Sequence, residues 1–174
     1  WFGDLVTMTW WDDLWLNESF ATWGSVVAQS EMTEYDTAWV TFANVEKAWA
    51  YDQDQLPSTH PVASDAHDIE TVEQNFDGIT YAKGASILKQ LQAYVGRDAS
   101  HAFGNATFDD LLGALAEASG KDLSWWADQW LKTTGMNELS ADVEVDDSGR
   151  YTRFAVAQGG ATPGAGELRT HRIG

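Results

Sequence analysis

Apolar residues recur three or four positions apart through most of the chain, and this spacing predicts helices. The first begins at Trp11-Asp12-Asp13, where acidic side chains favour a helix start, and Asp36 is the predicted N-cap of the second. Thr107-Phe108-Asp109-Asp110 resembles a capping box that opens the fourth. The predicted helices cover residues 11–29, 36–51, 77–95, 107–120 and 123–134, with Gly96, Gly120 and Gly135 at the ends of the last three.

Two other stretches follow different patterns. Residues 56–70 hold two prolines among polar side chains, and proline interrupts a helical ladder, so this stretch is predicted to be a loop. After Gly135 the apolar positions alternate, which predicts a β-hairpin with its turn at residues 146–149. Residues 159–166 are predicted to be loop and residues 168–174 to begin another strand. Two strands and a fragment are too few for an independent sheet.

Composition limits the classes of function. Hydrophobic residues make up 44% of the 174 residues, and the ten tryptophans lie at helical spacing, which indicates a packed core rather than a ligand platform. The net charge of -17 opposes binding to nucleic acid or to anionic membranes. The chain has no cysteine, no apolar run long enough to span a membrane and no signal-peptide pattern, so a cytoplasmic location is expected.

A first motif points to metal chemistry. The sequence W-L-N-E-S-F-A at residues 15–21, preceded by W-F-G-D-L-V-T at residues 1–7, resembles the segment that follows H-E-x-x-H in the aminopeptidase N family of zinc metallopeptidases. The resemblance implies that Glu18 is the third ligand of one catalytic Zn²⁺ and that both histidines and the general base stand before Trp1. A catalytic zinc needs three protein ligands and one open position, and a helix carboxylate can supply one of them. The four histidines of this chain form no cluster of their own.

A second motif supplies a tyrosine. The sequence N-F-D-G-I-T-Y-A-K-G-A-S at residues 75–86 resembles the Y-x-K-G tyrosine segment of the same family. This implies that Tyr81 is catalytic and donates a hydrogen bond to the oxyanion formed during peptide hydrolysis. Considered without the resemblance, Tyr81 fits a core tyrosine with a backbone partner. Lys83 and Gly84 are predicted to serve packing or local pairing, and His60-Pro61 resembles a structural loop feature of the family.

The resemblance covers about three quarters of the chain and implies a mainly α fold. Residues 1–136 are expected to form the C-terminal helical part of a thermolysin-like (gluzincin) catalytic domain, and residues 137–174 the incomplete start of a β-sandwich domain. Two departures stand out: Ser19 replaces a frequent glycine, and the stretch from Gly96 to Asn105 is short, by deletion or because residues are missing, where relatives carry another helix.

The expected activity belongs to the intact parent protein. The resemblance implies a zinc aminopeptidase that releases N-terminal amino acids from peptides with a free N-terminus. The 174-residue chain alone is expected to be inactive, because two zinc ligands and the general base lie outside it. Three alternatives stay open: a family member without catalysis that serves as a protein-binding scaffold, a complete helical interaction domain, and a zinc hydrolase of a non-peptide substrate such as a lipid epoxide.

Overall fold

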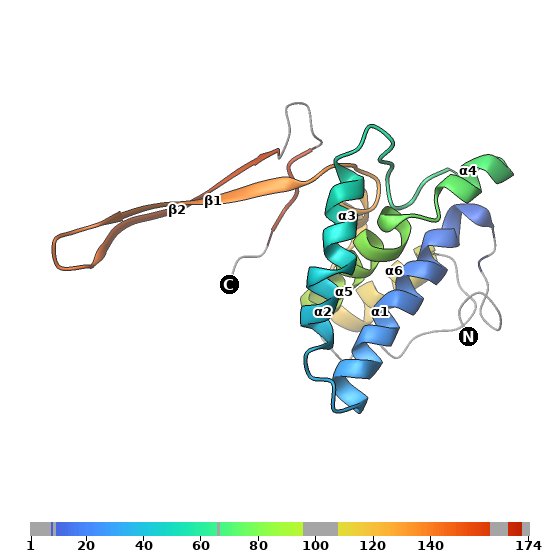
Figure 1. Ribbon diagram of the computed structural model, residues 1–174, viewed down its shortest axis with the longest axis horizontal. Helices are drawn as coiled ribbons and strands as arrows, with labels where there is room; N and C mark the ends of the chain where they lie inside the picture. The colour runs from blue at the N-terminus through green and yellow to red at the C-terminus, as the bar shows by residue number, and fades with distance from the viewer. Residues whose placement is uncertain (1–7, 9, 66, 96–107, 161–166, 172–174) are drawn as a thin grey trace.

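The computed structural model describes residues 8, 10–65, 67–95, 108–160 and 167–171, and it shows a helical body from which a long β-hairpin projects (Figure 1). This arrangement confirms the predicted mainly α fold followed by first β-strands. The body consists of the 3₁₀ turn η1 (Trp11–Asp13), α1 (Leu14–Met32), α2 (Ala38–Asn44), α3 (Glu46–Asp54), α4 (Ile69–Gln74), the π-helical turn η2 (Ile79–Lys83), α5 (Gly84–Val95), α6 (Phe108–Ser119) and α7 (Ser124–Trp130).

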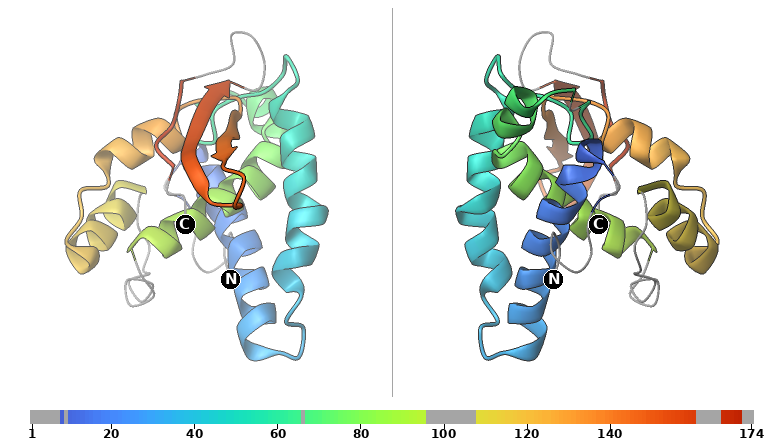
Figure 2. Two further views of the ribbon diagram at one scale, coloured as in Figure 1. Left: turned by 90° about the vertical axis from the view of Figure 1, so that its left-hand side faces the viewer. Right: turned by 90° about the vertical axis from the view of Figure 1, so that its right-hand side faces the viewer.

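The longest helix, α1, lies beside α2 and α3, which run in the opposite direction (Figure 2). Burial of apolar side chains holds this pair together and joins it to α5. Trp23 of α1, Phe42 of α2 and Leu88 of α5 are the largest members of the shared cluster, and each is less than a tenth exposed. The helix predicted over residues 11–29 is therefore confirmed, with η1 as its first turn.

A larger apolar cluster joins the first turns of α1 to η2, α5, α6 and α7. Three tryptophans, Trp15, Trp126 and Trp130, pack here around the fully buried Ile79 and Leu131. The prediction that the tryptophans serve core packing is confirmed for these three, but it is wrong for Trp10, Trp11 and Trp49, which are exposed. This core fixes the start of α1, which carries Glu18, against η2, which carries Tyr81.

The second predicted helix differs in its details from the structure. It consists of α2 and α3, ends at Asp54 rather than at Tyr51, and has Thr37 instead of Asp36 as its N-cap. The two parts meet at Val45, whose ψ of -68° departs from regular helix. Helical hydrogen bonds continue through this point, from Val45 N to Thr41 O at 3.0 Å and from Trp49 N to Val45 O at 3.1 Å. The break is therefore a local distortion in one continuous rod.

Two further helix boundaries were predicted wrongly. Residues 69 and 70 belong to α4 and not to the loop, because Asp68 caps this short helix by accepting a hydrogen bond from Thr71 N at 2.8 Å. The last helix ends at Trp130 and not near residue 134. Near this end the Arg169 guanidinium donates hydrogen bonds to Gln129 O at 2.9 Å, in the last turn of α7, and to Thr134 O at 3.0 Å, beyond the helix.

The predicted hairpin is confirmed and is longer than expected. Strands β1 (Asn137–Val145) and β2 (Tyr151–Gly160) pair in antiparallel register, and Gly159 and Gly160 belong to β2 rather than to the predicted loop because they pair with the first residues of β1. The expected further strand is absent from residues 168–171, where Arg169 N bonds the Asn137 side chain instead of a strand. Predictions for Gly96, for the stretch from Gly96 to Asn105, for Thr107, and for residues 161–166 and 172–174 lie outside the described residues.

Candidate active site

Glu18 lies in the second turn of α1 with its side chain partly exposed, between two buried neighbours. One of these neighbours, Ser19, is fully buried and donates a hydrogen bond through Oγ to Thr80 O at 2.6 Å. Because Thr80 belongs to η2, this bond ties the carboxylate-bearing turn of α1 directly to the segment that carries Tyr81.

Tyr81 occupies the middle of η2, whose start is fixed by Asp77. Asp77 Oδ1 accepts hydrogen bonds from Ile79 N at 2.9 Å and from Thr80 N at 3.2 Å, and Asp77 O accepts one from Tyr81 N at 3.1 Å. The Asp77 side chain therefore satisfies backbone donors that the first turn leaves without helical partners. Turns of the π type are rare and occur frequently at functional sites.

The structure brings Glu18 and Tyr81 together. The Tyr81 hydroxyl lies beside the Glu18 carboxylate, close enough for Glu18 to affect its ionisation. Burial, followed by hydrogen bonding to Glu18 and its negative charge, raises the pKa of Tyr81 to about 12. The phenol consequently keeps its proton at neutral pH, so the pair consists of an ionisable carboxylate beside a hydrogen-bond donor.

Close packing between α1 and η2 sets the distance between these two side chains. A Cβ placed on Gly84, the first residue after η2, would lie 1.9 Å from Ser19 Oγ. Only glycine fits against this serine, which confirms the packing role predicted for Gly84. On the opposite side, a Cβ placed on Gly78 would lie 3.2 Å from both the ring and the carbonyl oxygen of Trp49, so α3 also approaches the turn closely.

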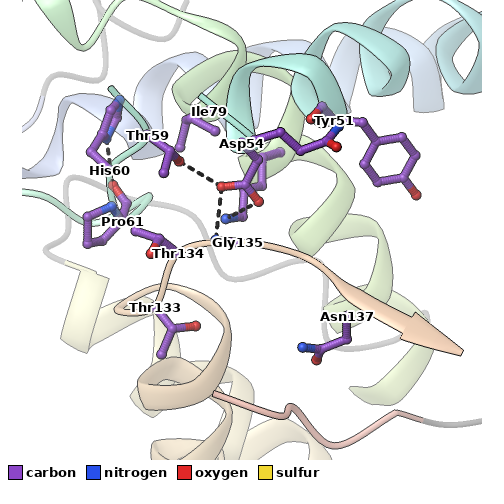
Figure 3. A network of polar contacts seen from close by, with 12 residues as sticks. Tyr51, Asp54, Thr59, His60, Pro61, Ile79, Thr133, Thr134, Gly135 and Asn137 are labelled. Carbon is purple, nitrogen blue, oxygen red and sulfur yellow. Dashed lines mark hydrogen bonds and ion pairs between the residues drawn. The ribbon is translucent and has the colours of Figure 1, made fainter. Parts of the chain in front are cut away.

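Lys83, the last residue of η2, forms an ion pair as predicted, but its partner Asp54 belongs to α3 and is not local in the sequence. Its Nζ lies 2.8 Å from Asp54 Oδ2, and the two side chains are 13% and 3% exposed. Asp54 Oδ1 in turn accepts hydrogen bonds from Thr59 Oγ1 at 2.7 Å and from Gly135 N at 3.1 Å, as Figure 3 shows. A buried carboxylate with three such partners is fully compensated.

His60 forms a second pair at the other end of η2. Its Nε2 lies 3.2 Å from Asp77 Oδ2. Its Nδ1 lies 2.8 Å from Pro61 O (Figure 3). Both partners are acceptors, so the ring satisfies both when both nitrogens carry protons. Burial lowers the pKa of His60, but the hydrogen bonds to Asp77 and Pro61 outweigh it and raise the pKa above its ordinary value.

The contacts of Asp54 and Asp77 around Tyr81 were not predicted from the sequence. Asp54 stands in an acidic, glutamine-rich helix end that has the pattern of a solvated surface, so no local signal marks it as buried. Asp77 was predicted as the start of a helix. Its position four residues before Tyr81 was the signal that could have indicated a role in holding the turn. His60 was predicted to be structural, and its contacts are with Asp77 and Pro61.

Among the described residues, no group of three histidine, cysteine, aspartate or glutamate side chains could hold a metal ion. Glu18 nevertheless has the character of a single ligand. It stands on a rigid helix, it is partly open to solvent, and no described lysine or arginine forms an ion pair with it. Within that same part of the chain, no helix is long and apolar enough to cross a bilayer.

The comparison with protein families identifies the class of protein to which this helical body belongs. The model of the Peptidase family M1 domain matches residues 1–130. The chain therefore belongs to peptidase family M1.

Three of the similar proteins are named as aminopeptidases. The chain is 53% identical to aminopeptidase N of Streptomyces lividans over 99% of its own length, but it spans only 22% of that protein. It is 39% identical to a leucyl aminopeptidase of Saccharolobus solfataricus over 78% of the chain and 18% of the relative. It is 36% identical to the yeast mitochondrial aminopeptidase 2 over 87% of the chain and 17% of the relative. The chain thus spans about a fifth of the length of these relatives.

Proposed function

We propose that the full-length protein carrying this chain is a zinc-dependent aminopeptidase that releases N-terminal amino acids from peptides. The observation that carries this proposal is the placement of the Tyr81 phenol beside the Glu18 carboxylate, through the packing of η2 on α1, within a segment matched by the M1 family. The aminopeptidase names of the relatives support peptides with a free N-terminus as substrates. A cytoplasmic location stays a prediction from the sequence.

In this proposal Glu18 is one of three protein ligands of a single Zn²⁺, and the other two are histidines expected before Trp1. The partly exposed carboxylate on a rigid helix fits this role. Bound zinc would supply a water of lowered pKa and polarise the peptide carbonyl. The residues described here contribute one ligand, so the chain by itself is expected to hold zinc weakly.

Tyr81 is proposed to donate its phenolic proton in a hydrogen bond to the oxyanion that develops on the peptide carbonyl. Its raised pKa supports this role, because the group remains a donor throughout the neutral range. Its placement on η2 supports it too, since donors fixed in advance of the reaction stabilise developing charge most strongly. Glu18 and Tyr81 thus have separate roles, one toward the metal and the other toward the reacting carbonyl.

The test compares two variants of the full-length protein. We expect Glu18→Gln to lose bound zinc and activity together, and Tyr81→Phe to keep zinc while kcat falls by roughly 10²–10³-fold, the usual cost of one oxyanion donor. Zinc is measured by elemental analysis and kcat with an aminoacyl chromogenic substrate. Exposed Glu34 and Tyr35 provide matched controls as Glu34→Gln and Tyr35→Phe, which should behave like wild type.

Two outcomes would overturn the proposal. Unchanged zinc content in Glu18→Gln would remove the ligand role, and an unchanged kcat in Tyr81→Phe would remove the catalytic role. A folded wild-type protein without zinc and without peptidase activity would instead support the noncatalytic scaffold.

A further inference from the structure

We propose that residues 54–61, here called the clamp, position Tyr81 for catalysis by binding both ends of the π-helical turn that carries it. The inference rests on the proposed function and assigns no chemistry to the clamp itself. Its two positioning residues are His60, which acts through Asp77, and Asp54, which acts through Lys83.

The first contact lies before Tyr81. Asp77 uses one carboxylate oxygen for the backbone of η2, at Ile79 N and Thr80 N, and the other for His60 Nε2. His60 therefore fixes the rotation of the same carboxylate that caps the turn. Asp77 and His60 are 13% and 17% exposed, so little water is available to replace this partner.

The second contact lies after Tyr81. Lys83 has Asp54 as its partner at 2.8 Å and makes no hydrogen bond to other described groups. Asp54 is itself held by Thr59 Oγ1, which belongs to the clamp, and by Gly135 N at the approach to the hairpin. One short segment thus holds a residue four positions before Tyr81 and a residue two positions after it.

These contacts surround a segment whose backbone is not a regular α-helix. A π-helical turn has poorer intrinsic stability than an α-helix and persists where its surroundings favour it. The clamp supplies a hydrogen bond at one end and an ion pair at the other, while Ser19 and Gly84 fix the face toward Glu18. A displacement of about 1 Å at a catalytic group can reduce the rate by roughly a hundredfold, so loss of the clamp should appear in catalysis.

The experiment measures kcat, KM and zinc content of full-length variants at one pH. We expect His60→Ala to lower kcat by roughly 10–100-fold with zinc content unchanged and KM little altered. His60→Gln should recover most of that loss, because its amide can still donate to Asp77. His67→Gln is the matched control, since His67 is 77% exposed in its side chain and lies in the same loop region. Lys83→Met tests the other end of the turn.

Each variant is also made in a Tyr81→Phe background. If the clamp acts through Tyr81, His60→Ala and Lys83→Met should cause little further loss of kcat in this background, because the phenolic hydroxyl that the clamp positions is already absent. Losses of equal size in both backgrounds would overturn the proposal, as would unchanged kcat in both folded single variants. If His60→Ala fails to fold, Lys83→Met compared across the two backgrounds decides. An inactive wild-type protein would refute the proposed function, whereas an active enzyme indifferent to these changes would refute the clamp alone.

Discussion

Gly84 lies where η2 becomes α5, and Ser19 of α1 occupies the space in which a side chain at position 84 would stand. A Cβ there would lie 1.9 Å from Ser19 Oγ and 2.9 Å from Ser19 Cβ, whereas Val62 Cγ1 would lie at an ordinary 3.4 Å. Because both Gly84 and Ser19 are buried, α1 and η2 must separate to admit a methyl group. We expect Gly84→Ala to lower the free energy of unfolding by about 1–3 kcal/mol, the usual cost of overpacking.

The sign of this effect should reverse when Ser19 is replaced by glycine. Gly84 has helical angles, φ -60° and ψ -44°, so alanine at this position is favourable in itself by roughly 0.5–1 kcal/mol. Ser19→Gly removes both clashing atoms. In that background Gly84→Ala should therefore raise the free energy of unfolding, and the coupling between the two sites should be about 1.5–4 kcal/mol.

The assay is equilibrium urea unfolding of the four proteins of this double-mutant cycle, followed by tryptophan fluorescence. Trp15 and Trp23 of α1 are buried and report on that helix. Gly24→Ala is the control, since a Cβ at Gly24 meets nothing within 4 Å. An equal change in unfolding free energy from Gly84→Ala in both backgrounds would refute the close approach of the two elements.

Three further predictions concern polar contacts. Asp54→Asn should lower the free energy of unfolding by about 3–5 kcal/mol, measured by urea unfolding, because it leaves the Lys83 ammonium buried without a charged partner. The pKa of folded His60 is raised above 6.5, so its protonated form should add stability that is present below pH 6.5 and lost as pH rises through the folded-state pKa. The difference in melting temperature between wild type and His60→Gln should therefore shrink over that range. A difference that does not depend on pH would contradict this prediction. Arg169→Lys should lower the free energy of unfolding by about 2 kcal/mol or more, because a lysine cannot replace the guanidinium bonds to several carbonyls, and urea midpoints equal to wild type would contradict it.

The sequence was most informative where its periodicity was long. The positions of α1, α5, α6 and the hairpin followed from repeated spacing of apolar residues, since burial of one face determines these elements. The six residues of α4 are too few to show a period, and its Asp68 cap resembles many loop aspartates. Arg169 could not be assigned, because its partners lie more than thirty residues earlier in the chain.

The roles of Glu18 and Tyr81 stay a prediction from the two motifs, and the geometry around them could not be predicted from the sequence. The proximity of the two side chains depends on the packing of Ser19 against η2. The burial of Asp54 depends on Lys83 and on Gly135, and neither is near it in the sequence. Pairing between distant polar groups leaves no periodic signal, so it becomes visible only in the folded chain.

The π-helical turn also makes the site sensitive to the number of residues and not only to their kinds. Each residue of an α-helix turns the chain by about 100°. Deleting Ala82 would let the segment join α5 as regular helix, with every polar group described above still present in the protein. Tyr81 would then be rotated by about that angle relative to α5 and would face away from Glu18. A one-residue length change here would thus separate two side chains that no substitution had touched.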